Sequence, residues 1–516
     1  MHDPRVKLKR NHKPLNSVVM DKDMDIARNN RRGFLKSLGV WALSTAVTGL
    51  TSAAKTNDKH YNVLLICVDD LRPQLGCFGH KEMISPNIDR LAGRGRLFTR
   101  HYVQAAVCGP SRCSMLTGKR LWDWDCWRQL RTQKTGPSDP VSLPHLFRRN
   151  GYYTVCIGKV SHQPGGVIGK EARVHQVPFS WDLAYAPVGP WKTPWGAFFS
   201  YDKGRIREYG YGKDDRTMPA YEAADVPDTG YADGLNAEEA VKQLRALKDR
   251  RFFLAVGFYK PHLPFNAPKK YWDLYDPAKI QLAKNPFAPT NVDPEIGRHP
   301  SFELTTHYNW PSGKGNVNED EACILRHAYF ACVSYVDAQI GKVLDEVKRL
   351  GLDKNTVIAL WSDHGWHLGE HGMWGKQTNF EVAVRSPLLV KIPNIPKPGK
   401  RTQSLVETVD LYPTLADLCG LAAPNDLAGT SLVPMINDPD HPGKRCAYSF
   451  HPRGPLMGRT LRTDRYRIVH WTNKKGETVQ VELYDHRTDP DENENIAGRD
   501  PELDDALLSE LKKIKL

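Results

Sequence analysis

Two pairs of residues, Asp69-Asp70 and Asp363-His364, have the chemistry of ligands for a hard metal ion. Each pair directly follows an apolar run. Three carboxylates and one imidazole suit Ca²⁺, with Mg²⁺ as the alternative, better than zinc, whose sites favour nitrogen and sulfur ligands. An Asp-Asp pair alone is more often a turn or a helix cap, so the prediction of a cation site depends on a companion group.

The companion is Cys108, in the stretch V-C-G-P-S-R at 107–112, which continues as C-S-M-L-T-G at 113–118. Most lone cysteines are small buried thiols, and that alternative applies here too. The stretch resembles the signature of the type I sulfatases, in which a formylglycine-generating enzyme converts the cysteine to formylglycine (3-oxoalanine). The resemblance implies that Cys108 is a processing site and completes the metal site.

Sulfate-ester hydrolysis gives a physical reason for such a conversion. A sulfate left on a serine would itself be a stable ester. The hydrate of an aldehyde offers one hydroxyl to attack sulfur, and its second hydroxyl can later lose a proton and expel sulfate, which regenerates the aldehyde. A cation held by the two acidic pairs would favour the attacking alkoxide and neutralise sulfate charge.

Further basic residues follow the apolar runs or the cysteine, and each alone would more often be structural or solvated. Arg112 lies four residues after Cys108 and can reach back towards the acidic pairs. His162 is a candidate base for expelling sulfate, and Lys159 is a candidate charge clamp. His262 and Lys376 are candidates for binding sulfate and protonating the leaving oxygen. We predict that these residues converge on one site.

Longer blocks of sequence resemble the iduronate-2-sulfatases among the type I sulfatases. These blocks are D-D-L-R-P-Q-L-G-C-F-G-H at 69–80, S-P-N-I-D-R-L-A at 85–92, Q-A-A-V-C-G-P-S-R at 104–112, G-K-V-S-H at 158–162, F-L-A-V-G-F-Y-K-P-H-L-P-F at 253–265 and S-D-H-G-W-H-L-G-E-H-G-M-W-G-K-Q-T-N-F-E at 362–381. The resemblance implies an alkaline-phosphatase-like fold and removal of the 2-O-sulfate of a uronic acid. It assigns the metal to Asp69, Asp70, Cys108, Asp363 and His364, and sulfate handling to Arg112, Lys159, His162, His262 and Lys376.

The elements that must position these residues are strands of a parallel sheet. From Tyr61 onward, β-rich apolar runs alternate with helical stretches. Four runs, 62–68, 153–157, 252–258 and 356–362, each lead into candidate site residues. Ligands bind beyond the carboxyl ends of strands in open α/β sheets, so these residues should meet at one edge. The expected fold class is α/β, with a mixed, mostly parallel sheet flanked by helices.

Other regions lack such clear chemistry. Residues 165–237 and 284–318 are rich in aromatic residues, Pro and Gly without a period, which predicts long surface loops that shape the sugar pocket or simply pack. Apolar periodicity predicts helices over 237–248 and 319–349. From about Asp440 short strands and a closing helix over 501–515 predict a small C-terminal α+β subdomain.

The N-terminal stretch N-R-R-G-F-L-K at 30–36 and the apolar residues after it have the form of a twin-arginine export signal. The apolar run is shorter than the ~20 residues of a spanning helix, so we expect no stable membrane insertion. The predicted division is an export signal at 1–54, a catalytic domain at 55–439 and a subdomain at 440–516. The predicted location is the bacterial periplasm.

Composition is that of an ordinary globular protein, with a net charge of +13 that suits a polyanionic substrate. The expected partners are a sulfated saccharide and, during maturation, a formylglycine-generating enzyme, with no nucleic acid. The ten cysteines include no C-x-x-C pair, which argues against a zinc ribbon or a thioredoxin-like site. Two alternatives stay open: a phosphate or phosphonate monoester hydrolase, and a non-catalytic protein that binds sulfated glycans.

Overall fold

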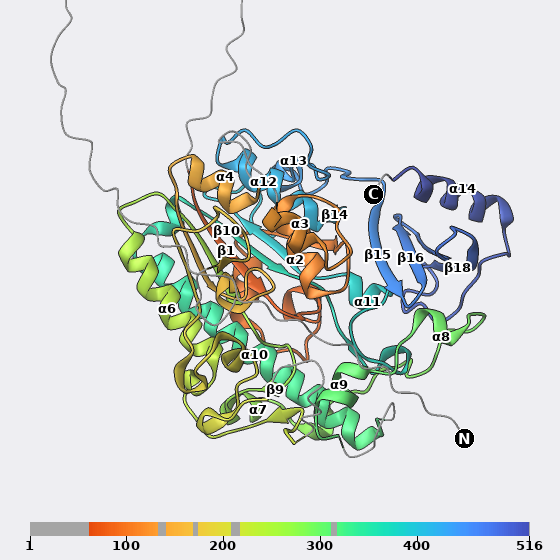
Figure 1. Ribbon diagram of the computed structural model, residues 1–516, viewed down its shortest axis with the longest axis horizontal. Helices are drawn as coiled ribbons and strands as arrows, with labels where there is room; N and C mark the ends of the chain where they lie inside the picture. Colours follow the sequence, from red (N-terminus) through yellow and green to blue (C-terminus); the bar gives the residue numbers. More distant parts are fainter. Residues whose placement is uncertain (1–60, 133–140, 169–173, 208–216, 311–316, 515–516) are drawn as a thin grey trace, which may run out of the picture. The chain divides into compact units, whose positions relative to one another are not determined.

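A computed structural model describes residues 61–132, 141–168, 174–207, 217–310 and 317–514. A central eight-stranded sheet has the order β14-β2-β13-β10-β1-β8-β3-β6 (Figure 1). Its strands are β1 (Asn62–Val68), β2 (Arg96–Tyr102), β3 (Tyr153–Gly158), β6 (Leu183–Tyr185), β8 (Phe252–Phe258), β10 (Thr356–Ser362), β13 (Leu388–Lys391) and β14 (Arg401–Glu407). Only β13 runs antiparallel to its neighbours in this sheet. The predicted mixed, mostly parallel sheet is confirmed.

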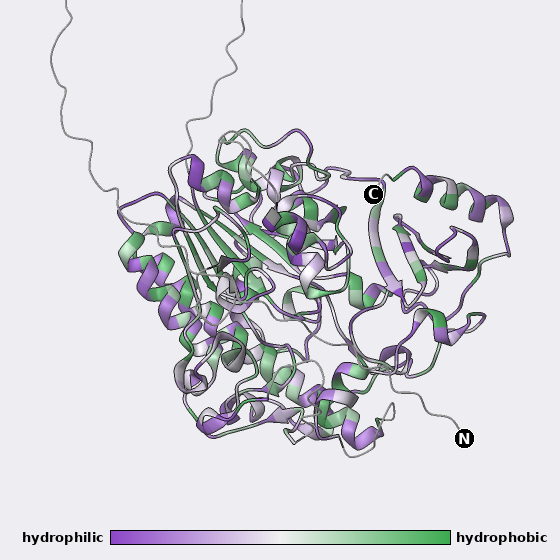
Figure 2. Ribbon diagram, in the orientation of Figure 1, coloured by the Kyte–Doolittle hydropathy of each residue, from purple (hydrophilic) through white to green (hydrophobic). Residues whose placement is uncertain are grey.

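Helices cover both faces of this sheet, because alternate side chains of each buried strand point to opposite sides. Leu64 and Ile66 of β1 pack in one apolar cluster with helices α1 (Pro86–Ala92), α6 (Ala232–Leu247) and α10 (Glu319–Arg349). Leu65 and Cys67 pack in another with α2 (Cys108–Thr117), α4 (Leu143–Arg149), α12 (Leu411–Leu418) and α13 (Val433–Asn437). Figure 1 labels helices of both layers, and Figure 2 shows the central strands mostly green, which marks apolar residues.

The long helix α10 has the bounds that the sequence predicts. Asn318 caps it, because its side chain accepts a hydrogen bond from the backbone of Glu321, whose carboxylate accepts one from the backbone of Asn318. Helix α6 begins at Ala232, five residues before its predicted start. Its early residue Asp233 accepts hydrogen bonds from the backbone of Tyr259 and Lys260, each at 2.8 Å, and so ties the helix to the end of β8.

Strands β2 and β14 were not predicted. Strand β2 carries two arginines and a histidine, which interrupt the apolar run by which a buried strand is recognised in the sequence. Arg96 is fully buried, and its guanidinium donates to the backbone carbonyls of Pro396, Lys400 and Ile436 at 2.8 to 2.9 Å. A buried charged group is tolerated there because its donors are paired.

The prediction of surface loops over 165–237 is partly wrong. Strand β6 extends the central sheet, and Trp181, Trp191 and Tyr201 are at most 5% exposed. Around helix α5 (Pro194–Phe198), aromatic side chains form a small core of their own, for which no sequence period is needed. The region 284–318 contains helices α8 (Pro294–Gly297) and α9 (Phe302–His307).

The C-terminal part is α+β, as predicted. Strands β15 (Ala447–Arg453), β16 (Leu456–Arg462), β17 (Tyr466–Thr472) and β18 (Thr478–Asp485) form an antiparallel sheet in chain order, against which α14 (Pro501–Lys512) packs. Strand β15 was missed. The boundary at 439/440 stays a prediction, and the export signal predicted at 1–54 lies outside the described residues.

Shorter elements complete the described chain. They are α3 (Cys126–Thr132), α7 (Lys269–Trp272), α11 (Glu381–Val384) and the strand pairs β4–β5 (Val167–Ile168, Val174–His175), β7–β9 (Tyr221–Glu222, Phe265–Asn266) and β11–β12 (His367–Leu368, Trp374–Gly375). All ten cysteines are free thiols in this structure. None of the helices in the described ranges is long and apolar enough to span a membrane.

Candidate active site

The carboxyl ends of neighbouring parallel strands bring most of the predicted residues together. Val68 of β1 lies in register with Ser362 of β10 and with Phe258 of β8. The residues that follow these strands, together with those after β3, therefore emerge side by side at one edge. Cys108 is the first residue of α2, and Lys376 follows β12.

Arg112 is fully buried and links the two acidic pairs. Its Nη2 donates to Asp69 Oδ1 at 3.0 Å, and its Nε donates to Asp363 Oδ2 at 2.8 Å. Lys159 Nζ donates to the other oxygen of Asp69 at 2.5 Å. Burial alone would raise the pKa of Asp69, but Lys159 and Arg112 outweigh it and hold that pKa well below its usual value. Asp69 is therefore a paired carboxylate.

Four potential metal ligands, Asp70, Cys108, Asp363 and His364, place one donor atom each within 4.8 Å of one another, and all four are buried. His364 Nε2 lies 3.2 Å from Cys108 Sγ, 3.5 Å from Asp70 Oδ1 and 3.8 Å from Asp363 Oδ1. His364 Nδ1 faces the carbonyl of Gly365 at 3.0 Å, which places the ring proton on Nδ1 and leaves Nε2 as a ligand atom.

The electrostatics of this cluster fit a divalent cation. Burial raises the pKa of Asp70, and it raises that of Asp363 to about 6, although Arg112 opposes it there. Burial lowers the pKa of His364 to about 4, so that the imidazole is neutral. Two carboxylates and an imidazole lone pair thus face one another with too little positive charge between them. A divalent ion supplies that charge.

Cys108 is buried beside this cluster. Burial and the charge of Asp69 raise the pKa of its thiol well above the usual value. The unmodified side chain is therefore a neutral thiol, and a neutral thiol is a poor nucleophile. The geometry places position 108 at the centre of the cluster without making its sulfur reactive.

Lys376 and His262 form a second layer next to Asp70. Lys376 Nζ lies 3.1 and 3.0 Å from the two carboxylate oxygens of Asp70, and His262 Nε2 lies 3.8 Å from Asp70 Oδ2. Burial alone would lower the pKa of Lys376, but the carboxylates of Asp70 and Glu303 raise it well above its usual value. Lys376 is therefore a fixed positive charge.

Glu303, on α9, is a site residue that the sequence did not reveal. Its carboxylate lies 3.0 Å from His262 Nε2 and 3.3 Å from Lys376 Nζ, and its side chain is 18% exposed. Lys376 and His262 together outweigh the effect of burial and hold the pKa of Glu303 well below its usual value. The stretch F-E-L-T-T-H that carries it has no period and no recognisable motif, so no signal pointed to it.

The K-P-H-L-P-F segment that carries His262 is held from two sides. Lys260 Nζ donates to the carbonyls of His262 and Pro264 at 2.9 and 2.5 Å. Asp233 of α6 accepts the backbone N–H of Lys260. Trp366, two residues after His364, is 1% exposed and packs near His262 and Phe265.

His162 joins the site through ring contacts rather than hydrogen bonds. Trp124 lies edge-on to it at 4.8 Å between ring centroids, and Trp195 lies at 5.6 Å on α5. Its Nδ1 has no hydrogen-bond partner among the described residues. Burial, and then the charge of Lys159, lower the pKa of His162 well below its usual value, so the ring is neutral and able to accept a proton.

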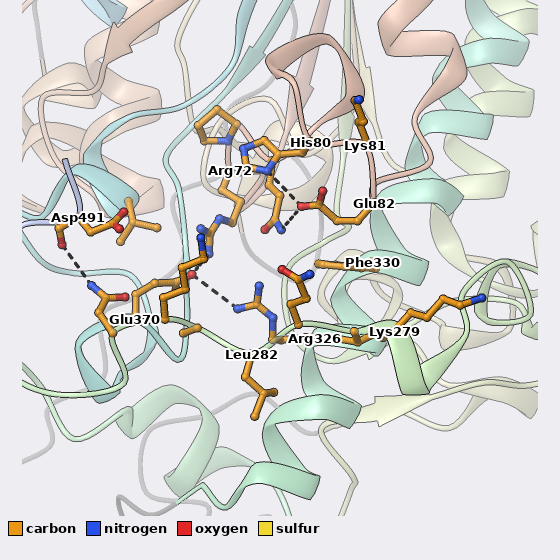
Figure 3. Close-up of a pocket in the computed structure, with 18 of the residues that line it drawn as sticks. Arg72, His80, Lys81, Glu82, Lys279, Leu282, Arg326, Phe330, Glu370 and Asp491 are labelled. Carbon is orange, nitrogen blue, oxygen red and sulfur yellow. Dashed lines mark hydrogen bonds and ion pairs between the residues drawn. The ribbon is translucent and has the colours of Figure 1, made fainter. Parts of the chain in front are cut away.

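The cavity drawn in Figure 3 is separate from the candidate active site. Its volume is about 870 Å³, and it is lined by Arg72, Arg326 and Glu370 among others. Glu370 accepts from Arg72 Nη1 at 2.9 Å and lies 3.6 Å from Arg326 Nη1. None of the predicted site residues lines this cavity.

Comparisons with known proteins bear on the whole described region. The family model described as "Sulfatase" matches residues 61–421, and the model "N-sulphoglucosamine sulphohydrolase, C-terminal" matches 369–515. Iduronate 2-sulfatase of Mus musculus is 34% identical over 507 residues, covering 83% of this chain and 88% of that protein. A sulfatase of Formosa agariphila is 32% identical over 465 residues, covering 88% and 86%.

Among solved structures, the phosphonate monoester hydrolase from Silicibacter pomeroyi matches with a TM-score of 0.68 at 23% identity, covering 88% of this chain and 94% of that one. This likeness concerns the fold alone, and it agrees with the predicted alkaline-phosphatase-like architecture.

Proposed function

The chain belongs to the sulfatase family and is a sulfuric ester hydrolase, and from this premise we propose that it is a formylglycine-dependent, calcium-dependent enzyme that removes the 2-O-sulfate of a uronic acid. The observation that carries the proposal is the position of Cys108. Its Sγ lies 3.2 Å from His364 Nε2 and 3.9 Å from Asp70 Oδ1, inside the four-residue ligand cluster.

Maturation is the first part of the proposal. A formylglycine-generating enzyme converts Cys108 to formylglycine, because the raised pKa of the thiol leaves the unmodified residue without a nucleophile near neutral pH. The N-terminal signal at 1–54 directs the protein to the periplasm. The hydrated aldehyde then supplies the oxygen that attacks sulfur.

The metal site is the second part. Asp69, Asp70, Asp363, His364 and position 108 hold the ion, for which the oxygen-rich set favours Ca²⁺. When bound, the ion supplies positive charge that stabilises the attacking oxygen and the sulfate. Arg112 remains paired with Asp69 and Asp363 throughout, so these carboxylates keep their orientation.

The remaining residues handle the sulfate group and two protons. Lys159, Lys376 and His262 present N–H donors to the sulfate oxygens, and these donors are held in place before the substrate arrives. His262 protonates the oxygen that leaves with the sugar, while Lys376 keeps its charge. His162, neutral because of its burial, accepts the proton whose removal expels sulfate from position 108.

The substrate assignment rests on the relatives. The mouse relative is named for iduronate 2-sulfate, and 34% identity over most of both chains supports a related sulfated saccharide here. A phosphate or phosphonate monoester hydrolase is the competing activity. A non-catalytic glycan-binding role is disfavoured because Cys108 and every predicted ligand and sulfate-handling residue are present.

Mass spectrometry tests the maturation. Trypsin releases residues 101–112, a peptide with a single cysteine. Co-production with a maturing enzyme should make this peptide about 18 Da lighter than its thiol form, because an aldehyde replaces CH₂SH. Active enzyme that contains only unmodified Cys108 would overturn the mechanism.

A second experiment compares hydrolysis rates on a 2-O-sulfated uronic acid disaccharide, an aryl sulfate and an aryl phosphate. These rates separate the proposed sulfatase activity from the competing phosphate or phosphonate monoester hydrolase.

A further inference from the structure

We propose that Trp124 is a carbohydrate-stacking residue that receives the apolar face of the sugar at the mouth of the active site. This inference rests on the proposed function, because it assigns the sugar side of the same site. Trp124 lies in the segment between α2 and α3. Trp124 is 53% exposed, although its ring contacts His162 and Gly109. An indole left half in water beside His162 offers an aromatic face to a ligand.

Two contacts fix where the indole lies. Its ring is edge-on to His162, with centroids 4.8 Å apart and an interplanar angle of 72°. The ring also rests on the backbone of Gly109, the residue after Cys108. A Cβ at position 109 would lie 2.2 Å from Trp124 Cζ3, so only glycine allows this approach. Trp124 therefore stands directly beside His162, the proposed base, and beside the residue that follows Cys108.

The sugar must lie on this side of the site. A sulfate ester joins the sugar carbon to sulfur through a single oxygen, so the ring follows the sulfate closely. The interior around Cys108 is occupied by Asp69, Asp70, Asp363 and Arg112, all fully buried. The exposed indole offers an open surface next to that interior.

The aromatic lining continues beyond Trp124. Trp195 flanks the other side of His162 at 5.6 Å and donates from its Nε1 to Gln163 Oε1 at 2.8 Å. Sugars present apolar C–H faces and polar edges, and aromatic rings with a few placed amides suit both. Burying the exposed indole face against such a ring is favourable because apolar surface leaves water.

A quaternary ammonium group is the competing occupant, since cations also bind aromatic faces. The test distinguishes a sugar ring from a quaternary ammonium group. It assays wild type, Trp124→Ala and Trp124→Tyr with a 2-O-sulfated uronic acid disaccharide and with choline sulfate. Phe179→Ala is the control, because Phe179 is 54% exposed and packs against His145 of α4 rather than against site residues.

For Trp124→Ala we expect KM for the disaccharide to rise about tenfold with kcat changed less than about twofold, and Trp124→Tyr to retain most of the affinity. Inorganic sulfate, which probes only the sulfate-binding residues, should inhibit wild type and Trp124→Ala equally. The desulfated disaccharide should bind the alanine variant about tenfold more weakly, also when measured by calorimetry on protein with unconverted Cys108.

A fall in kcat with KM unchanged would overturn the inference, because it would make Trp124 a support for His162. A loss confined to choline sulfate, or no change at all, would overturn it too. The proposed function fails differently: wild-type enzyme would then turn over no sulfated saccharide, whatever the residue at 124.

Discussion

The sulfate-binding side and the sugar-binding side of the site are built by different means. The sulfate side, which comprises Asp69, Asp70, Arg112, Lys159, Asp363, His364 and Lys376, consists of buried charges joined by ion pairs. The proposed sugar side, which comprises Trp124 and Trp195, consists of aromatic rings on connections between the strands, and Glu303 lies between the two sides. The first is held by the register of the central sheet, and the second is not.

The difference follows from what each side must do. Sulfate charge is stabilised only if opposite charges are already oriented when it arrives, and buried charges persist only when they are paired. A sugar ring is recognised by apolar contact and a few hydrogen bonds, which loops can supply and vary without disturbing the sheet. Reaction type therefore belongs to the strand ends, whereas substrate choice belongs to the connections.

The sharpest test of this division is Asp363→Asn. The substitution removes a negative charge from the ligand cluster but keeps an oxygen that can accept from Arg112. We expect turnover of every sulfate ester to fall at least about 1000-fold, because the change acts on the shared chemistry and not on the sugar.

Metal content, measured by elemental analysis after dialysis, should fall with it. Asp249→Asn is the matched control, since the Asp249 side chain is 86% exposed and precedes β8, at the opposite end of that strand from His262. A variant that kept full metal and full turnover would show that the cluster at Asp363 is not the metal site.

Sequence alone predicted that the residues of the sulfate side lie together, and Asp69 and Asp363 show why; their roles stay predictions. Asp69 and Asp363 each end a buried, apolar, β-rich run, and parallel strands deliver their carboxyl ends to one edge. The runs at β1, β8 and β10 have the predicted bounds. The spatial order of the strands, with β13 inserted antiparallel between β10 and β2, and the presence of β2 and β14 needed the structure.

The sugar side and Glu303 were not predictable in the same way. Glu303 lies on a six-residue helix in an aperiodic stretch, and its partners His262 and Lys376 are distant in sequence. Trp124 lies in W-D-W-D, a motif that says nothing about which ring faces Gly109.

Strand β2 of the central sheet escaped detection because the guanidinium of buried Arg96 is hydrogen-bonded by carbonyls from segments 300 or more residues away.

A second test uses pH to separate the two sides. Burial raises the pKa of Asp363 to about 6, so below that pH the metal-free site holds a proton that the cation must displace. Affinity for Ca²⁺ should therefore be level above pH 6 and fall about tenfold per pH unit below it. His364, with a pKa of about 4, adds little in this range.

Calorimetry at pH 5.0, 6.0 and 7.5 in buffers of different ionisation enthalpy would measure both the affinity and the released proton. The metal-free protein should show the linked effect on stability. The folded state binds the extra proton between the ordinary pKa of 3.8 and about 6, so the free energy of unfolding decreases as pH rises through that window. Stacking of a sugar ring on Trp124 involves no protonation change, so binding of the desulfated disaccharide should not depend on pH in this range. Equal pH dependence for Ca²⁺ and for the desulfated disaccharide would contradict the division between the two sides.

The smallest effect is expected at the boundary between the sides, from Glu303→Gln. The carboxylate of Glu303 holds the side chains of Lys376 and His262 in the absence of substrate, and sulfate must compete with it for these donors. The amide keeps the size of the side chain but removes the competing charge. Inorganic sulfate should therefore inhibit the variant a few-fold more tightly, while kcat falls about tenfold because His262 and Lys376 are less firmly oriented.

Steady-state kinetics with sulfate as a competitive inhibitor measures both quantities. Glu295→Gln, on the exposed surface of nearby α8, should change neither. If Glu303→Gln instead weakened sulfate binding and left kcat intact, the carboxylate would belong to the sulfate side as a structural ion pair. A rise in KM for the disaccharide beyond the change for sulfate would place it on the sugar side, as an acceptor for a hydroxyl next to the ester. Comparing the inhibition constant of sulfate with KM for the disaccharide thus shows to which side of the site Glu303 belongs.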